Sequence, residues 1–414
     1  MKKKLSLFLV LMLMASLLAG CGGGSEDSSE SPSNSGKDTE NTDRNSSSDK
    51  APDNEGETLK IGVVAPLTGT NKLVGEYTKN GVEMAVDEIN SSGGVLGRQI
   101  EIVYGDEVDS LQNSVNATTM LLSDDSIVGI VGTMYSQYSI AVMPEVEAAG
   151  VPYFASGSSS GIPNENNPYT WQVRPVDTFQ GITMADFAVN TLDMKNPAIM
   201  YSTQSTFASL SEQTQKALQD EGLEITDANL FGFPEEETNY APYFAQILAG
   251  DYDGIIALSN QMPAALIMQQ AEIAGVDPEK IPCLGSTSYC SNVAITNGGS
   301  SSNGWYSIAD WIPGGFTEAG AEFEDRYQEK YNSQSDLPSV EYYDAVYLIK
   351  EACEKSGSTD REAINEALKE IKNYPGAIST FSYFDDHVFA TSLGITRNID
   401  ETPTMIESVT FREP

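Results

Sequence analysis

Histidine and cysteine, the side chains most used for metal binding and nucleophilic catalysis, are scarce in this chain. One histidine, His387, and four cysteines occur among 414 residues, and no CxxC pair, P-loop or GxGxxG motif is present. A single imidazole excludes a multi-histidine metal site and leaves His387 as the only base for a Ser/His/Asp triad. We therefore expect no metal, no other cofactor and no catalytic residues.

Basic side chains are also few. The chain has 23 Lys and Arg against 60 Asp and Glu, a formal net charge of −37. Such a chain repels nucleic acid and anionic surfaces, so no nucleic-acid partner is expected. The simplest interpretation of this charge is solubility outside the cell. Hydrophobic residues make up 40% of the chain, enough to supply the cores of two or three domains.

The first twenty residues have the pattern of a secretory signal peptide. Three lysines precede an apolar run, Leu5 to Leu18, that is short for a membrane span. The sequence Leu18-Ala-Gly-Cys21 resembles a bacterial lipobox. The resemblance implies that Cys21 is lipidated and holds the protein at the extracytoplasmic face of the bacterial cell membrane. An ordinary signal peptide with a chance cysteine is the alternative.

A polar segment follows the signal peptide. Residues 21–58 are Gly, Ser, Asn, Asp and Glu with almost no apolar side chain, and acids far outnumber bases. Such a segment cannot bury a core and repels itself. We expect a disordered acidic tether between the anchor and a folded body.

From residue 59 onward, strand patterns alternate with helix patterns. Apolar runs predict strands at 59–67, 99–104, 127–131 and 151–155, and helical spacing predicts intervening helices, among them 110–123 and 136–149. A second series predicts helices at 179–192, 207–221 and 264–274 and strands at 198–201, 254–259 and 281–284. This order predicts two α/β units with parallel sheets covered by helices on both faces.

The last 110 residues contain too few strands for a third domain. A strand at 305–308 and helices at 318–331, 340–355 and 360–371 precede short strand-like pieces. We expect this segment to complete the first two units.

Several short sequence motifs, in this order along the chain, resemble those of a known protein family. They are Gly62–Gly69, Gly81–Asn90, Gly93–Gly97, Gly129–Gly132 before Ser136, Gly150–Pro152, Arg174 with Asp177 and Gln180, Ala274–Val276 and Tyr343–Tyr347. Together they resemble the extracellular solute-binding proteins of the leucine/isoleucine/valine type that serve ABC importers, here in lipoprotein form. The resemblance covers residues 59–414.

The resemblance implies the periplasmic-binding-protein type I fold, an α/β architecture with two doubly wound, Rossmann-like lobes joined by three hinge crossings. We expect the crossings near Asp177, Asp310 and Gly394. Residues 59–177 and 310–394 would then form the first lobe, and residues 178–309 and 395–414 the second. The ligand would lie in the cleft between the lobes.

Hydroxyl-rich loops follow two strands of the first unit. They are Gly132–Ser139, after the strand that ends at Val131, and Ser156–Gly161, after the strand that ends at Ala155. In open α/β sheets, ligands bind beyond the carboxyl ends of strands, where helix N-termini attract anions. A plain N-cap is the alternative for a serine at one helix start. Two neighbouring loops of this kind favour a carboxylate ligand.

The resemblance implies specific roles in these loops. Ser136 falls on the family's carboxylate-binding serine, and Gly157 on a position whose backbone contacts the ligand. Ser159 falls on a hydroxyl position that touches both head groups of an amino acid, with Ser158 as its substitute if the alignment slips by one. Tyr135 and Tyr138 are bulky where smaller residues are common.

The second half of the site departs from the family pattern. The acid that usually receives the ligand's ammonium group falls near Thr287, in a loop without an acid. Asn260 stands near a usual aromatic position and Val74 near another, whereas Phe207 keeps an aromatic. Other acids and aromatics that could take over these roles are Asp106, Asp310, Glu341, Trp311 and Tyr342, although structural roles fit each of them equally or better.

These features predict a lipid-anchored receptor that closes two lobes around a small amino acid, branched-chain or related, or a similar carboxylate. It would deliver that ligand to an ABC permease in the membrane. A binding module for amides or ureas, or one feeding a membrane sensor, is the alternative. A surface hydrolase is disfavoured because no Gly-x-Ser-x-Gly elbow is present. A disulfide between Cys283 and Cys290 is left open, and Cys353 is expected to be a buried thiol.

Overall fold

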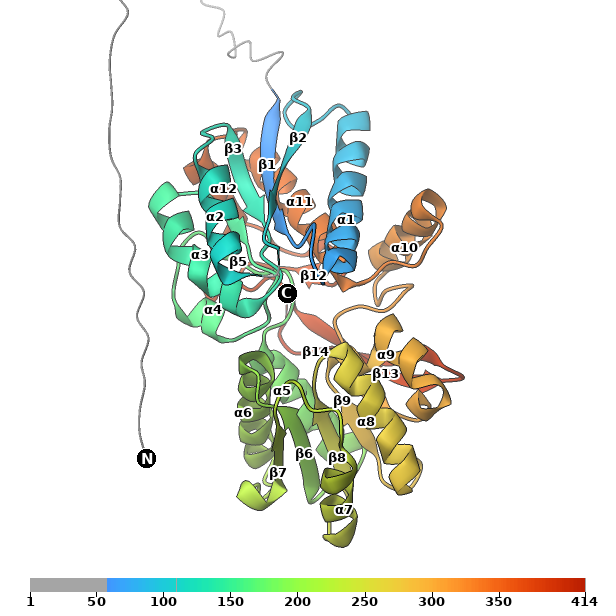
Figure 1. Ribbon diagram of the computed structural model, residues 1–414. Helices are drawn as coiled ribbons and strands as arrows, with labels where there is room; N and C mark the ends of the chain where they lie inside the picture. Colours follow the sequence, from blue (N-terminus) through green and yellow to red (C-terminus); the bar gives the residue numbers. More distant parts are fainter. Residues whose placement is uncertain (1–57, 109, 414) are drawn as a thin grey trace, which may run out of the picture. The chain divides into compact units, whose positions relative to one another are not determined.

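The computed structural model describes residues 58–108 and 110–413, and these belong to one compact unit. Two sheets organise it (Figure 1). The first sheet has five parallel strands in the order β2-β1-β3-β4-β5. They are β1 (Leu59–Ala65), β2 (Ile100–Asp106), β3 (Ile127–Val131), β4 (Tyr153–Phe154) and β5 (Thr170–Trp171).

Both faces of the first sheet are covered, as the continuous apolar character of its strands requires. On β1, Ile61 and Val63 pack into a core formed with α1 (Lys72–Ser91) and α11 (Leu337–Ser356). The next residue, Val64, packs on the opposite face, in a core shared with α2 (Leu111–Leu122) and α3 (Ser136–Ala149). The period of two along a strand therefore divides one hydrophobic run between two helical layers.

The second sheet has seven strands in the order β14-β13-β10-β9-β8-β6-β7. Its parallel part is β6 (Pro197–Ser202), β7 (Leu230–Phe233), β8 (Gly254–Leu258), β9 (Cys283–Gly285) and β10 (Tyr306–Ala309). The helices of this lobe are α5 (Asp177–Asp186), which continues as a π-helical turn over Phe187–Thr191, α6 (Ser205–Asp220), α7 (Ala241–Ala249), α8 (Gln261–Ala274) and α9 (Asn292–Gly298).

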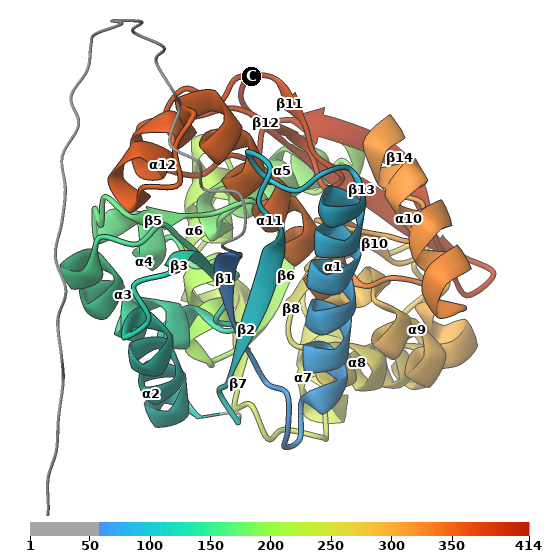
Figure 2. The same cartoon turned by 90° about the horizontal axis from the view of Figure 1, so that it is seen from above.

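The C-terminal third serves both lobes. Helices α10 (Glu318–Tyr331), α11 and α12 (Arg361–Leu368) bury side chains in the first-lobe core, together with the hairpin of β11 (Tyr374–Pro375) and β12 (Thr380–Phe381). Strands β13 (Ser392–Ile399) and β14 (Thr402–Thr410) then extend the second sheet antiparallel to β10. Figure 2 shows these late segments, in orange and red, beside elements from the start of the chain.

The chain therefore passes between the lobes three times, before α5, after β10 and before β13. The first passage leads to α5, which starts at Asp177, and the second follows β10, which ends at Ala309. The third lies earlier than predicted, because Gly394 already pairs with Ala309 inside the second sheet. Several short elements, β5, β7, α7 and α9 among them, have no counterpart among the expected ones. The four residues of β7 form an edge strand interrupted by Gly232, too short to give a periodic signal.

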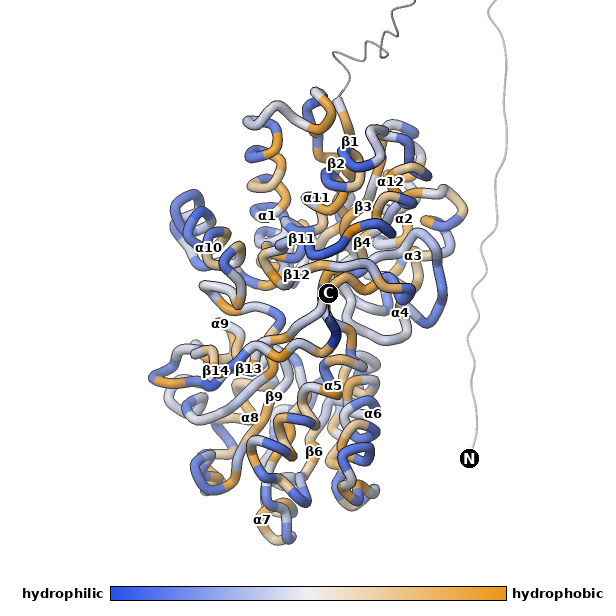
Figure 3. Tube along the Cα trace, turned by 180° about the vertical axis from the view of Figure 1, so that it is seen from behind, coloured by the Kyte–Doolittle hydropathy of each residue, from blue (hydrophilic) through white to orange (hydrophobic). Residues whose placement is uncertain are grey.

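Hydropathy along the trace follows this layering. Figure 3 shows hydrophobic colour on the inner strands of both sheets and hydrophilic colour over much of α10. Across residues 58–108 and 110–413, every helix is too short or too polar to cross a bilayer. The predicted signal peptide, the lipidation site Cys21 and residues 21–57 of the tether lie outside the described residues.

Candidate functional site

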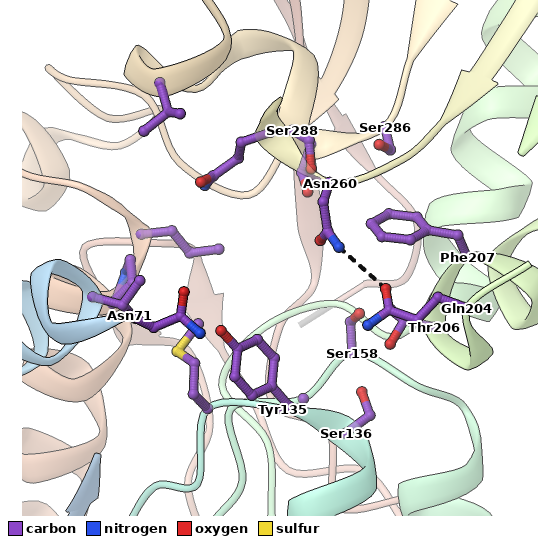
Figure 4. Close-up of a pocket in the computed structure, with 18 of the residues that line it drawn as sticks. Asn71, Tyr135, Ser136, Ser158, Gln204, Thr206, Phe207, Asn260, Ser286 and Ser288 are labelled. Carbon is purple, nitrogen blue, oxygen red and sulfur yellow. Dashed lines mark hydrogen bonds between the residues drawn. The ribbon is translucent and has the colours of Figure 1, made fainter. Parts of the chain in front are cut away.

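A cleft of about 700 Å³ opens between the two sheets, beyond the carboxyl ends of their parallel strands. Its first-lobe wall comes from the residues after β3 and β4 and from the start of α1. Its second-lobe wall comes from the residues after β6, β8 and β9. Figure 4 shows Ser136 and Ser158 directed into the cleft from one side and Asn260 and Gln204 from the other.

Ser136 is the first residue of α3 and is almost completely buried. The preceding Tyr135 is extended, with φ −112° and ψ 145°, so the chain turns sharply into the helix. Ser136 is not the N-cap; instead its Oγ accepts a hydrogen bond from the Ser159 N–H at 3.2 Å. Backbone N–H groups in the first helical turn have no acceptor within the helix and favour negative charge. The α3 N-terminus, which lines the cleft, is therefore suited to a carboxylate.

Gly157 allows the two hydroxyl-rich loops to meet. A Cβ at this position would lie 2.6 Å from Ser136 Cα and 2.7 Å from Ser136 Oγ, closer than atoms can pack. Its carbonyl accepts a hydrogen bond from Gln172 Nε2 at 2.6 Å, which fixes the loop. The Gly157 backbone thus lines the cleft beside Ser136 without a side chain between them.

The neighbouring serines have different surroundings. Ser158 lines the cleft, and its carbonyl accepts a hydrogen bond from the Asp177 N–H at 2.7 Å. Ser159 is not among the lining residues, and its Oγ accepts a hydrogen bond from the Gly161 N–H at 3.1 Å. Of the two alternative hydroxyls in this loop, the structure therefore brings Ser158 to the cleft and uses Ser159 to brace Ser136.

The second-lobe wall is polar. Gln204 and Thr206 follow β6, Asn260 follows β8, and Ser286 to Ser288 follow β9. Asn260 Nδ2 donates a hydrogen bond to Gln204 Oε1 at 3.2 Å. Thr287 lines the cleft, and no carboxylate stands in its loop. Gln204, Thr206, Ser286 and Ser288 were not expected in the site, although the strand-end rule applied to the first lobe could have found them.

Aromatic rings from both lobes contribute to the lining. Tyr135 and Tyr138 lie edge to face, with ring centroids 5.3 Å apart. Phe207 lines the opposite wall and lies beside Asn260 in Figure 4. Tyr77 on α1 also lines the cleft, as does Val74 on the same helix. Tyr77 was not anticipated, because the resemblance pointed only to Val74 there.

Three acids of the described residues line the cleft, and Asp177 is the one that is completely buried. Asp177 starts α5 and is 0% exposed. Neither carboxylate oxygen has a well-formed hydrogen bond among the described residues, but the nearby Ser158 and Ser209 hydroxyls and the Arg174 guanidinium favour its charged form. Burial raises the pKa of Asp177 to about 7. Asp336 is occupied as the N-cap of α11, where its Oδ1 accepts a hydrogen bond from the Leu337 N–H, and Glu235 is exposed.

The other acids considered as ligand partners lie elsewhere. Asp310 is buried outside the lining and forms an ion pair with Arg174, so it is not available to a ligand, contrary to the expectation. Glu341 is also buried behind the wall, and burial raises its pKa to about 8. Asp106 accepts hydrogen bonds from Thr68 and the Leu67 N–H, and these bonds lower its pKa.

A family model described as "Periplasmic binding protein" matches residues 58–401 of this chain. The chain belongs to the periplasmic binding protein family. As a periplasmic binding protein it has the two-lobed type I α/β fold, in a family of solute receptors rather than enzymes.

Relatives of this periplasmic binding protein include the Leu/Ile/Val-binding protein homolog 7 of Brucella suis. The two are 27% identical over 328 residues, which cover 76% of this chain and 81% of the relative. A leucine binding protein, LivK, from Thermotoga maritima superposes with a TM-score of 0.76 at 22% identity, covering 86% of this chain and 99% of its own. LivJ of Streptococcus pneumoniae, solved with isoleucine, gives the same TM-score and identity, covering 86% of this chain and 100% of its own.

Cysteine and histidine lie away from the cleft of this periplasmic binding protein. Cys283, Cys290 and Cys353 are buried free thiols, so the disulfide left open by the sequence is not formed. His387 lies in a turn and stacks on Trp171, with centroids 4.1 Å apart. Within the described ranges, no cluster of three or more His, Cys, Asp or Glu side chains could hold a metal ion.

Proposed function

We propose that this protein is a lipid-anchored receptor of an ABC importer that captures a small α-amino acid in its cleft. One observation carries the proposal: a helix N-terminus with hydroxyl groups, suited to a carboxylate, and the fully buried carboxyl group of Asp177 line the same cavity. An α-amino acid carries the two charges that match these groups. The names of the Brucella, Thermotoga and Streptococcus relatives support the same class of ligand.

The carboxylate group of the ligand would bind at Ser136, Gly157 and Ser158. The Ser136 hydroxyl and the first turn of α3 supply donors, and Gly157 lets the ligand reach the backbone. A helix N-terminus favours an anion without a cationic side chain. The one arginine that lines the cleft, Arg174, is already neutralised by Asp310.

The ammonium group of the ligand would bind to Asp177, which replaces the acid that the family has near the position of Thr287. A buried carboxylate whose desolvation outweighs its stabilising neighbours gains from a bound cation, because the cation offsets the remaining cost of burying the charge. Ligand binding would then lower the pKa of Asp177 and hold it ionised.

We propose that the ligand is captured by hinge closure, because both lobes contribute residues to the lining of the cleft. Residues of both lobes face one cavity, so a bound ligand bridges them and favours the closed arrangement. We propose lobe boundaries at the three passages, with residues 59–177 and 310–391 in the first lobe and residues 178–309 and 392–413 in the second. Closure would create the surface recognised by the permease.

The lipid anchor is proposed from the sequence Leu18-Ala-Gly-Cys21. Replacing Cys21 by Ala should move the protein from the membrane fraction to the medium or periplasm, because a diacylated cysteine provides stable anchoring and a bare chain does not. The matched control is Cys353→Ala, which removes a buried thiol of the folded body. Membrane retention of the Cys21→Ala variant would contradict the anchor.

The binding test compares each amino acid with its des-amino analogue, for example leucine with 4-methylpentanoate and asparagine with succinamate. For any amino acid that binds, calorimetry on the purified protein should show an affinity at least tenfold higher than that of its des-amino analogue. The reason is that a hydrogen bond to a charged group contributes about 1.5–3 kcal/mol. Asp177→Asn should remove that preference, whereas Glu235→Gln, an exposed acid of the same cleft, should keep it.

Ser136→Ala should weaken the amino acid and its analogue alike, because both carry the carboxylate. If des-amino carboxylates bind as tightly as amino acids, the α-amino acid assignment is wrong and a plain carboxylate receptor remains. If amides or ureas bind and carboxylates do not, the carboxylate site at the α3 N-terminus is misassigned and the amide or urea alternative replaces it. Loss of uptake in cells lacking a neighbouring permease would separate import from a sensor role.

A further inference from the structure

Two amide side chains form a pair on the second-lobe wall. Asn260 Nδ2 donates to Gln204 Oε1 at 3.2 Å, and both side chains are half-buried and face the cavity (Figure 4). Gln204 follows β6 and Asn260 follows β8, which are adjacent strands of the second sheet. The pair therefore stands on the rigid part of the lobe.

Each member of the pair occupies a helix N-cap without capping the helix. Gln204 precedes α6 and Asn260 precedes α8, and neither side chain accepts a hydrogen bond from its helix. Asparagine is among the best N-cap residues, so the Asn260 side chain could stabilise α8 by capping it but does not. Its side chain is directed into the cleft instead, which points to a partner there.

The pair leaves one acceptor and one donor unused. Among the described residues, neither Asn260 Oδ1 nor Gln204 Nε2 makes a hydrogen bond, although each amide could make more than one. Rotating both amides exchanges the residue that supplies the acceptor with the one that supplies the donor, and the pair still offers one of each. A primary amide presents the complementary pattern, a carbonyl acceptor next to an N–H donor.

The surroundings extend this polar character. Thr206, Ser286 and Ser288 line the same wall, and Phe207 supplies a flat apolar face beside Asn260. A hydrocarbon side chain bound here would leave the amide pair desolvated and unsatisfied once the lobes close. Sites built to hydrogen-bond a ligand reject analogues that lack the matching group more strongly than apolar pockets reject an added one.

We propose that Gln204 and Asn260 select an amino acid whose side chain carries a neutral amide, rather than a branched hydrocarbon. This inference rests on the proposed function, because the α-carboxylate and α-ammonium groups are assigned to the first-lobe side of the cleft. The amide pair then recognises the far end of the ligand, and Phe207 packs on its methylene groups.

The test uses pairs of amino acids that share a shape. Asparagine is compared with leucine and glutamine with methionine by calorimetry on the purified protein. The amide member should bind at least tenfold more tightly in one or both pairs. The wild-type panel decides the question without any variant, so a variant that fails to fold does not remove the test.

Variants then locate the preference. Asn260→Leu and Gln204→Met should lower affinity for the amide ligand about tenfold or more and raise affinity for its apolar counterpart. Gln246→Met is the matched control, because Gln246 lies on α7, outside the cleft, and its exposed side-chain amide donates a hydrogen bond to the Pro242 carbonyl at 3.2 Å. Its selectivity should equal that of the wild type, and circular dichroism should show all three variants folded.

The outcomes separate the two proposals. Binding of leucine or methionine as tightly as the amide members would overturn the amide inference and leave the amino-acid receptor intact. Failure of every amino acid to bind would overturn both. If Asn260→Leu weakens all ligands by the same factor, the pair acts as a latch between lobes, and its assignment to the ligand is wrong.

Discussion

The first-lobe and second-lobe walls of the cleft both follow the carboxyl ends of parallel strands. They differ in the polar groups that they present to the cleft. The first wall uses the α3 N-terminus, the Gly157 backbone and short hydroxyls. The second uses the longer side chains of Gln204 and Asn260. Backbone groups cannot be changed by substitution, whereas amide side chains can. The difference suggests one wall for the constant head group of the ligand and another for its variable part.

The two walls meet above a buried ion pair, and its loss should have the largest effect. Arg174 comes from the first passage and pairs with Asp310 at the second, with both side chains nearly or fully buried. Arg174→Met leaves Asp310 as an uncompensated buried charge, so the free energy of unfolding should fall by about 3–5 kcal/mol.

Urea denaturation of the apo protein measures this effect. The double variant Arg174→Met/Asp310→Leu should recover much of the lost stability, because it removes both charges. If the single variant is as stable as the wild type, the ion pair does not support the junction of the walls.

On the first-lobe wall, we expect substitution of Gly157 to disrupt carboxylate binding. In Gly157→Ala the new Cβ would overlap Ser136, so affinity for any carboxylate ligand should fall about 100-fold, near 3 kcal/mol. Gly161→Ala in the same loop is the control, because its Cβ would have 3.3 Å to Ser159 Oγ and 3.4 Å to Ile140 Cδ1. Calorimetry should find near-normal affinity for the control. Equal losses in both variants would show a general sensitivity of the loop.

The walls should also respond differently to pH. Because burial raises the pKa of Asp177 to about 7, its carboxylate is mostly ionised at pH 8 and mostly protonated at pH 6. Affinity for an α-amino acid should therefore fall about tenfold from pH 8 to pH 6. The neutral amide pair of the second wall has no titration in this range, so the amide-to-hydrocarbon preference should stay constant. A flat affinity profile would separate Asp177 from the ligand's ammonium group.

The smallest expected effect concerns Glu341 behind the first wall. Burial raises its folded-state pKa from 4.5 to about 8, so protonated Glu341 favours the folded state. That stabilisation is complete below the unfolded pKa and is lost as the pH rises through about 8. Between pH 7 and pH 9 the wild type should lose on the order of 1 kcal/mol that Glu341→Gln retains. Thermal denaturation at the two pH values measures the difference, and identical pH dependence of both proteins would exclude it.

Much of the fold could be predicted from local pattern. The run from Leu59 predicts β1, and the apolar spacing of Val82, Ala85, Val86 and Ile89 predicts α1, because burial of a strand or helix face leaves a periodic trace. β7 left no such trace, since it is short and lies at a sheet edge. The passage expected at Gly394 was misplaced because no local feature marks where a strand changes lobes.

The candidate site divides in the same way. Strand ends and loop composition mark Ser136 and Gly157, and the family resemblance pointed to the position of Asn260; all three line the cleft. Asp310 was misjudged because its partner Arg174 lies 136 positions away in sequence. Asp177 was expected as a hinge crossing and not as a ligand partner, because its complete burial at the cleft depends on how the loops and α5 pack around it.

The sequence by itself determined the alternation of strands and helices, the hydroxyl-rich loops, the scarcity of metal ligands and the resemblance to a family of receptors. Those features reside in neighbouring residues and in periodicity. Tertiary structure alone decided which acid is completely buried at the cleft and which amides pair. Both outcomes depend on contacts between segments brought together by the three passages, where desolvation and hydrogen-bond satisfaction are set by residues far apart in the chain.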